Sequence, residues 1–392
     1  IQMKRNKLKK VFSGIMTAAL ALTLCLGTAV PVSAGSGTEA SPAEATITKK
    51  FQHAQGVTTP AATFTFAFTK VSEDGAAPSS NMPNIANKTV NYTAADNGTT
   101  AAGLTTVTKE TGNILDGITW PHAGEYVYSI VENATGYTPG TGENLTYSQA
   151  TYKLYVRVAN GTSGLYVANV MAERVVDDNG DTVSPGVKVD PAPGNGAGNG
   201  LAFTNVFTKR GGGTDADSLI ISNAVSGTYA DRTKQFNFSL TVTNAPTSSA
   251  TSFTGTITKA DTTTSTVTVS PGTAQTFTLA HGEKLTFSDL PAGTTYTLSQ
   301  TGMAGYKPSY RVIENGGTPS AGTAADFGDG LATGTRLVGE NANSADFTNT
   351  YDDGTITDTG ILVNNLPFIV LIGVSLLALG AVVVSKRRQM GR

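Results

Sequence analysis

Residues 63–68 read Thr-Phe-Thr-Phe-Ala-Phe, and residues 235–242 read Gln-Phe-Asn-Phe-Ser-Leu-Thr-Val. In both stretches every second side chain is apolar. Because successive side chains of a β-strand point to opposite faces, this period of two predicts strands with one buried face. Turn sequences such as Leu290-Pro-Ala-Gly293 separate these and similar runs, and no long stretch between the two ends of the chain has helical spacing. The sequence therefore predicts an all-β fold of antiparallel sandwiches.

The order of these segments repeats along the chain. The strands expected at 46–51, 63–68, 124–132 and 201–207 have counterparts at 219–225, 235–242, 293–300 and 346–351. We therefore expect two tandem immunoglobulin-like β-sandwich domains, at about residues 42–208 and 215–352. The glycine-rich segment 209–215 predicts a short flexible joint between them, and residues 191–200 predict a surface loop before the last strand of the first domain.

Composition excludes several classes of protein. The chain has 27 basic and 29 acidic residues, but nine of the basic ones lie in the first 34 and the last 33 residues, which carry no acid. The body between them is therefore acidic, which argues against nucleic-acid binding. The single Cys25 excludes a disulfide framework, and the three widely spaced histidines indicate no metal site. No nucleophile elbow or phosphate loop indicates an enzyme, and no cofactor is expected.

The first 34 residues have the pattern of a secretory signal peptide. Basic residues from Lys4 to Lys10 precede an apolar run, which ends in Val32-Ser-Ala34. The small residues at its end predict cleavage after Ala34 and a secreted protein. A retained membrane anchor is the alternative.

Residues 356–392 combine three elements in a fixed order. Residues 366–384 are apolar and long enough to cross a bilayer, and a basic cluster from Lys386 onward follows them. A short polar motif precedes them and consists of Ile356, Thr357, Asp358, Thr359 and Gly360. An ordinary single-pass membrane anchor is one interpretation of this C-terminus.

The same triple resembles the cell-wall sorting signal of Gram-positive surface proteins, whose motif is Leu-Pro-x-Thr-Gly. The resemblance implies that a sortase cuts between Thr359 and Gly360 and joins the Thr359 carbonyl to an amine. Ile356 and Thr357 stand where that motif has Leu and Pro. This departure suggests a dedicated, pilus-type sortase rather than the housekeeping one.

Three apolar strand faces of the first domain each carry one polar side chain, namely Lys49, Glu132 and Asn205. A buried ion pair capped by the amide is one interpretation, since an unpaired buried amine is costly. The other interpretation is a reaction, because burial lowers the pKa of a lysine and raises that of a glutamate. Protonated Glu132 would donate to the Asn205 carbonyl, and neutral Lys49 would attack its carbon. Ammonia would leave, and a Lys49–Asn205 amide would form in a single turnover.

The segments around these residues resemble the major pilins of streptococci, which have two domains and an intramolecular Lys–Asn isopeptide bond in each. The matching motifs are Ile-Thr-Lys at 47–49, Tyr-x-Ile-x-Glu at 128–132 and Phe-Thr-Asn at 203–205, with further matches at 225–227, 231–238, 289–293 and 347–349. The resemblance implies an isopeptide bond between Lys49 and Asn205, with Glu132 as the proton shuttle. It also implies a secreted structural subunit on the cell surface, which sortase polymerises or anchors to the wall.

The second domain departs from this pattern. Asn223 stands in the lysine position and Gln300 in the carboxyl position, while Asn349 is kept. An amide nitrogen is a poor nucleophile, and glutamine cannot carry the proton. We therefore expect a hydrogen-bonded cluster of these three side chains and no Lys–Asn bond.

A fibre built by sortase needs an acceptor amine on the neighbouring subunit. In the resembled pilins this is a lysine on an exposed stretch ahead of the last strand of the first domain, which makes Lys188 the candidate. A solvated lysine without a role is the alternative. The expected partners are sortase, neighbouring pilin subunits or peptidoglycan, the membrane before sorting, and a host surface ligand. The alternative functions are a monomeric wall-anchored adhesin or minor (base) pilin, and a surface hydrolase, for which no catalytic motif is present.

Overall fold

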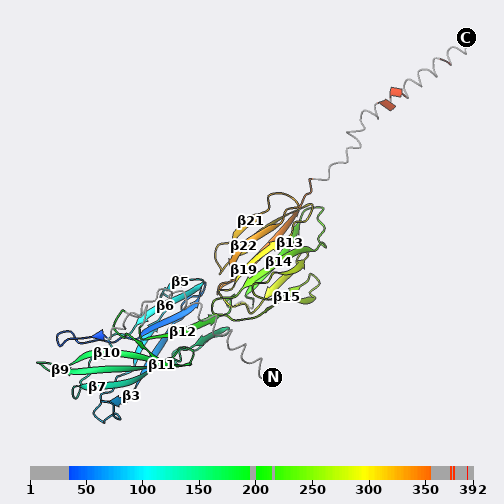
Figure 1. The fold of residues 1–392 in the computed structure, drawn as a ribbon. Helices are drawn as coiled ribbons and strands as arrows, with labels where there is room; N and C mark the ends of the chain where they lie inside the picture. Colours follow the sequence, from blue (N-terminus) through cyan, green and yellow to red (C-terminus); the bar gives the residue numbers. More distant parts are fainter. Residues whose placement is uncertain are drawn as a thin grey trace.

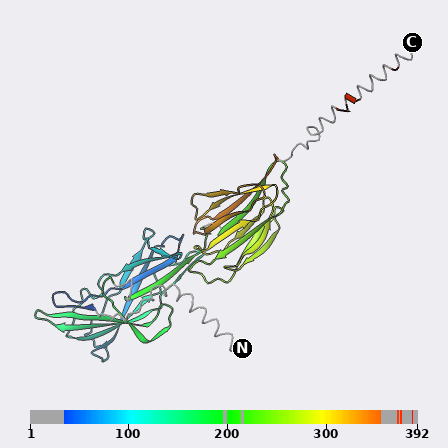
Figure 2. The ribbon, with the colours of Figure 1, turned by 45° about the horizontal axis from the view of Figure 1, so that its top comes forward.

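The structure is a computed structural model that describes residues 35–194, 200–213 and 217–354, together with residues 371, 372, 374, 375 and 386. The described residues form four β-sheets, two in each of two bodies that follow one another along the chain (Figure 1). Figure 2 shows the same two bodies from a second angle. The prediction of an all-β fold with tandem sandwiches is confirmed.

Two sheets face each other in the first body. The larger sheet has the order β1 (Gly35–Ser36), β10 (Leu165–Val176), β9 (Thr151–Asn160), β7 (Gly124–Asn133), β3 (Ala62–Glu73) and β4 (Lys88–Tyr92), and β11 (Thr182–Val189) also pairs with β10. The smaller sheet has the order β5 (Thr99–Ala101), β6 (Leu104–Glu110), β2 (Thr48–Ala54), β12 (Ala202–Lys209) and β8 (Glu143–Thr146). All of these pairings are antiparallel except that between β2 and β12, which is parallel.

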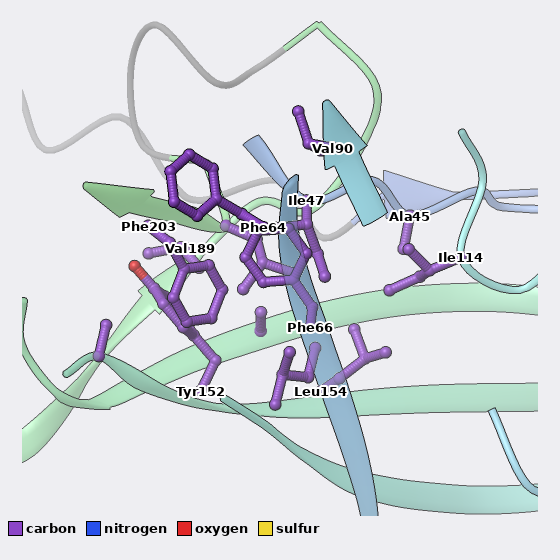
Figure 3. Close-up of a cluster of buried hydrophobic side chains, with 14 of the residues drawn as sticks. Ala45, Ile47, Phe64, Phe66, Val90, Ile114, Tyr152, Leu154, Val189 and Phe203 are labelled. Atoms are coloured by element: carbon purple, nitrogen blue, oxygen red, sulfur yellow. The ribbon is translucent and has the colours of Figure 1, made fainter. Parts of the chain in front are cut away.

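The core of the first body lies between these two sheets and is rich in aromatic rings. Phe51 of β2 has its ring centroid 5.2 Å from that of Phe64 of β3 and also 5.2 Å from that of Tyr92 of β4. Figure 3 shows part of this cluster, in which Phe66 and Phe203 approach each other from opposite sheets. Each fully buried ring contributes about 1.5–3 kcal/mol. The alternating phenylalanines of residues 63–68 thus hold the two sheets together.

The second body repeats this arrangement. Its larger sheet has the order β16 (Thr264–Val269), β15 (Phe253–Thr258), β18 (Lys284–Phe287), β13 (Leu219–Ser226), β23 (Ser344–Tyr351), β20 (Tyr306–Ile313) and β21 (Ser320–Thr323). Its other sheet has the order β17 (Gln275–Leu279), β14 (Phe236–Thr243), β19 (Thr295–Gln300) and β22 (Leu331–Leu337). Its core contains Phe238, whose ring centroid lies 5.2 Å from that of Phe347.

The registers of the two bodies correspond residue by residue at their first and last strands. β13 and β23 run parallel, as β2 and β12 do. Lys49 is opposite Phe203 in the first body, and Asn223 is opposite Phe347 in the second. Likewise Phe66 is opposite Glu132, and Phe238 is opposite Gln300. Each body therefore brings the same three strand positions together.

The joint between the bodies differs from the sequence expectation. The backbone N–H of Ala292 donates to the Lys209 carbonyl at 2.8 Å, and that of Gly211 donates to the Leu290 carbonyl at 2.8 Å. The prediction that residues 209–215 form a flexible joint is therefore wrong for residues 209–213, which the structure describes. The reason is that the peptide groups of this glycine-rich segment are paired with the second body.

A buried carboxylate also ties the two bodies together. Oε2 of Glu340 accepts a hydrogen bond from Nζ of Lys209 at 3.0 Å, and Oε1 accepts from the backbone N–H of Thr58 at 3.0 Å and from its hydroxyl. The two bodies also approach closely at Gly293, where an added Cβ would lie 2.3 Å from the Cβ of Ala54. Only glycine fits there.

The two ends of the chain are not part of this description. The predicted signal peptide 1–34, the sorting motif 356–360 and most of the apolar span 366–384 lie outside the described residues. Within the residues that the structure does describe, no helix has the length and apolar character needed to span a membrane.

The joint predicts the effect of removing its carboxylate. In a Glu340→Ala variant, the N–H of Thr58 loses its acceptor and the amine of Lys209 keeps only Glu143, 3.5 Å away, at a cost of about 1–3 kcal/mol to the contact between the bodies. We expect segment 209–213 to become sensitive to protease and the two bodies to melt in separate calorimetric transitions. Glu314→Ala, which removes an ion pair with Arg336 inside the second body, is the control. Wild-type protease resistance in Glu340→Ala would contradict this role.

Candidate functional site

Three inward-facing polar side chains meet in the core of the first body. Lys49 comes from β2, Glu132 from β7 and Asn205 from β12. Lys49 and Asn205 are 0% exposed, and Glu132 is 9% exposed. The alternation of side chains along each strand turns all three inward, so that the carboxylate of the larger sheet faces the amine and the amide of the smaller one.

The carboxylate of Glu132 bridges the other two side chains. Its Oε2 lies 2.6 Å from Nζ of Lys49, and its Oε1 accepts a hydrogen bond of 2.7 Å from Nδ2 of Asn205. One acid thus contacts both the amine and the amide nitrogen. This is the arrangement in which a proton can pass from the first nitrogen to the second.

Apolar and aromatic groups surround this triad. Nζ of Lys49 lies 4.7 Å from the ring centroid of Phe64, and the hydroxyl of Tyr92 donates to the Lys49 carbonyl at 2.8 Å. On the other side, Phe203 packs against Phe66 at 5.0 Å between ring centroids. The rings keep bulk water from the three polar groups, which strengthens every electrostatic interaction among them.

Burial shifts both ionisable groups toward their neutral forms. Desolvation lowers the pKa of Lys49 to about 8, although the charge of Glu132 opposes the shift. Desolvation likewise raises the pKa of Glu132, against the opposing effect of Lys49 and of the hydrogen bond from Asn205. A neutral amine beside a neutral acid is therefore accessible near neutral pH.

The amide of Asn205 is oriented differently from the sequence expectation. Its carbonyl oxygen accepts a hydrogen bond of 2.7 Å from the backbone N–H of Ser148, and its nitrogen faces Glu132. In the reaction interpretation Glu132 donates to this carbonyl, whereas the observed contacts are those of the other interpretation, an ion pair capped by the amide. An ionised carboxylate can only accept, so the amide nitrogen turns toward it and the carbonyl is left for the N–H of Ser148.

The second body holds the three expected amides at the corresponding positions. Nε2 of Gln300 donates to Oδ1 of Asn349 at 2.6 Å, while Nδ2 of Asn349 donates to Oδ1 of Asn223 at 2.9 Å and to Oε1 of Gln300 at 3.0 Å. Nδ2 of Asn223 donates to the carbonyl of Leu279 at 3.0 Å. The cluster is buried and contains neither an amine nor an acid.

The remaining candidate residues lie elsewhere or outside the description. Lys188 is exposed on β11, where its partner across the pair with β10 is Glu173. The motif 356–360 lies outside the described residues. No group of three or more His, Cys, Asp or Glu side chains in the described part of the chain is placed to hold a metal ion.

Sequence reasoning missed two residues of the site, Ser148 and Asp178. Both lie outside the strands, and nothing in the strand alternation marks them. Oδ1 of Asp178 accepts from the hydroxyl of Ser148 at 2.5 Å and from the backbone N–H of Thr204 at 2.9 Å. These contacts depend on how the loops pack, which a period-two pattern does not encode.

Two family models match consecutive parts of the chain. Residues 45–208 match the family model of the Spy0128-like isopeptide containing domain, and residues 217–351 match that of a domain of unknown function (DUF7601). No curated protein matches the chain.

The chain is also similar to several solved structures. The major pilin of Streptococcus pyogenes is 21% identical, with 79% of this chain and 99% of that chain covered and a TM-score of 0.34. A second S. pyogenes major pilin (T-13) is 21% identical, with 82% and 100% covered and a TM-score of 0.32. The pilus-presented adhesin Spy0125 is 18% identical, with 51% and 35% covered and a TM-score of 0.24. The family-model match of residues 45–208 agrees with the Gram-positive pilin family that the sequence motifs indicate.

Proposed function

We propose that this protein is a secreted structural subunit of a cell-surface pilus, and that its first domain crosslinks itself through an amide bond between Lys49 and Asn205. The observation that carries the proposal is the buried bridge of Glu132, with 2.6 Å to Nζ of Lys49 and 2.7 Å to Nδ2 of Asn205. The family-model match of residues 45–208 supports it. No external enzyme is needed for this bond, because the reacting groups are held together by the fold.

The reaction is an exchange of one amide for another. Lys49 passes a proton to Glu132, and the neutral amine attacks the side-chain carbon of Asn205. Glu132 gives this proton to the amide nitrogen of Asn205, which it already contacts, and then takes up the second proton that Nζ of Lys49 loses on becoming an amide N–H. The bond between Nζ of Lys49 and Cγ of Asn205 forms, the bond between Cγ and Nδ2 breaks, and ammonia leaves.

The bond would join β2, the first long strand of the domain, to β12, its last strand. β2 and β12 are parallel neighbours, so that a pull on the two ends of the domain would act across this pairing. The crosslink closes a loop of about 157 residues, and chain entropy assigns such a loop a stabilisation on the order of 5 kcal/mol. A domain without disulfides would gain in this way a covalent link that thiol reductants do not cleave.

Removing the amine or the acid tests the crosslink. Wild-type protein is expected to weigh one ammonia less than its formula mass, while Lys49→Met and Glu132→Gln retain that ammonia. The uncrosslinked first domain should lose up to about 5 kcal/mol of unfolding free energy. Intact-mass spectrometry and calorimetry measure the two effects. Lys50→Met, on the opposite face of β2, is the control and should keep the bond. A wild-type mass equal to the formula mass would rule the crosslink out.

The pH dependence of bond formation follows from the two pKa shifts. Below the raised pKa of Glu132 both groups are protonated, and the ammonium of Lys49 cannot attack. Above the pKa of Lys49 at about 8, Glu132 has lost the proton that the leaving nitrogen needs. We expect a bell-shaped rate of ammonia loss when unfolded, unreacted chain is diluted into buffers from about pH 5 to pH 10. A rate that climbs steadily to the alkaline end would contradict the shuttle.

The second domain is expected to stay uncrosslinked. Its Asn223, Gln300 and Asn349 supply no amine and no acid. Proteolytic peptides that cover 217–351 should therefore have unmodified masses, while the one missing ammonia maps to a linked pair of peptides that contain Lys49 and Asn205. A missing ammonia in the second domain would overturn this assignment.

Polymerisation by sortase completes the proposal. Sortase would cleave after Thr359 and transfer its carbonyl to Lys188 of the next subunit, or to peptidoglycan at the pilus base. The exposure of Lys188 on β11 supports this choice of acceptor.

A conservative substitution tests the acceptor. Lys188→Arg keeps the positive charge but offers no nucleophilic amine, so co-expression with a pilus-type sortase should give no ladder of linked multimers on a cell-wall immunoblot. Lys153→Arg is the matched control, since Lys153 flanks the same Glu173 from β9 and should leave the ladder intact. A persisting ladder in Lys188→Arg would exclude this acceptor, and a single wild-type band would indicate a monomeric wall-anchored protein instead.

A further inference from the structure

The carbonyl oxygen of Asn205 has a dedicated partner that the amine–acid–amide triad does not provide. It accepts a hydrogen bond of 2.7 Å from the backbone N–H of Ser148. We infer that this N–H is the oxyanion donor of the amide exchange, and that the side chain of Asp178 positions it. The inference rests on the proposed Lys49–Asn205 crosslink and adds a fourth and a fifth participant to it.

Charge develops on this oxygen during the reaction. When Nζ of Lys49 bonds to Cγ of Asn205, the carbonyl electron pair moves onto Oδ1, which becomes an alkoxide in the tetrahedral intermediate. Glu132 contacts the two nitrogens and so is not placed to neutralise this oxygen. The N–H of Ser148 is already within the distance at which an oxyanion donor acts, and it is buried. When Nδ2 departs with its proton from Glu132, the electron pair returns and the carbonyl reforms.

Asp178 fixes the donor relative to the strand that carries the acceptor. Its Oδ1 accepts from the hydroxyl of Ser148 at 2.5 Å and from the N–H of Thr204, the residue before Asn205, at 2.9 Å. The backbone carbonyl of Asp178 also accepts from the N–H of Gln149 at 3.1 Å. Asp178 therefore ties the loop before β9 to β12 next to the reacting amide.

The hydroxyl of Ser148 is fully used in this contact. It accepts from the backbone N–H of Ala150 at 3.2 Å and donates to Asp178. The side chain thus holds the turn in which the backbone N–H points at Asn205, and the side chain itself does not touch the reacting atoms.

In the second domain, the amide oxygen that corresponds to Oδ1 of Asn205 has a different donor. The oxygen of Asn349 accepts from Nε2 of Gln300, a side chain of the cluster itself. In the first domain the corresponding oxygen is held by a backbone group from outside the triad. The donor accompanies the domain that has an amine and an acid, as expected for a group that serves the reaction.

An amide-to-ester replacement at Ser148 tests the donor directly. The ester keeps the side chain and the chain length but removes the N–H. The reaction starts when the secreted chain, unfolded in denaturant and not yet crosslinked, is diluted into buffer. We expect the ester to lower the rate of ammonia loss about 10²- to 10³-fold. The matched control is the ester at Ile114, which removes a buried backbone hydrogen bond of 2.8 Å to the Ala45 carbonyl in the same domain. The control should react at the wild-type rate.

Substitutions of Asp178 test whether its side chain positions the donor. Asp178→Ala removes the acceptor for both Ser148 and Thr204 and should slow ammonia loss about 10- to 100-fold. Asp178→Asn keeps an Oδ1 that can accept both hydrogen bonds, so it should restore most of the rate. Ser148→Ala, which removes the hydroxyl, should likewise slow ammonia loss, and Ser148→Thr, which keeps a hydroxyl, should restore most of the rate. An Asp178→Asn chain as slow as Asp178→Ala would overturn the positioning role.

The outcomes separate this inference from the proposed function. If the wild-type chain loses no ammonia, the crosslink itself is wrong. If the wild type reacts and the Ser148 ester reacts equally fast, the crosslink stands and the oxyanion donor is wrong. Rates are compared for chains whose first domain resists protease, and Asp178→Ala gives the same readout with an unaltered backbone. A slow Ser148 ester with a fast Ile114 ester supports the inference.

Discussion

The first domain is organised around one carboxylate in a dry core. Glu132 contacts Lys49 and Asn205 at once, and each member depends on the other two. An ion pair in a dry core adds little net stability, because desolvation of both charges offsets their attraction. Loss of one partner leaves the other buried and unpaired. Conversion of the amine and the amide into a single neutral amide would remove the ammonium and leave a group that hydrogen bonds alone can satisfy. The same burial that makes the ion pair costly would therefore favour its disappearance.

Strand topology places the reacting groups where a bond between them has a mechanical effect. Lys49 and Asn205 lie on two parallel neighbours, the first long strand and the last strand of the domain. A crosslink between two adjacent strands of one hairpin would leave most of the domain free to unravel. A crosslink between the first and last strands encloses nearly all of it, so tension along the chain would pass through the covalent bond instead of the hydrogen bonds of the sheets.

Much of this could be predicted from sequence, because period two fixes which side chains face inward. The alternation around Phe64 and Phe66 predicts β3, and the same alternation predicts that Lys49, Glu132 and Asn205 face the core. The contacts of Ser148 and Asp178 could not be predicted, since they join a loop to a strand far away in sequence. The orientation of the Asn205 amide was predicted wrongly for the same reason. The glycines of 209–213 indicated flexibility, but their peptide groups found partners in the second domain.

The second domain has the same strand register as the first, but its three buried polar side chains are uncharged amides. Asn223, Gln300 and Asn349 occupy the register of the triad, yet each is an amide that both donates and accepts. Three amides can satisfy one another in a core without desolvating an ion, so this cluster avoids the penalty that the first domain carries. The penalty and the reactivity have one origin, because the amine and the acid of the first domain are costly to bury as charges and are also the groups that exchange the proton. A domain with this frame and no charges would be stable by hydrogen bonds and packing, without the amine and the acid that the proposed bond requires.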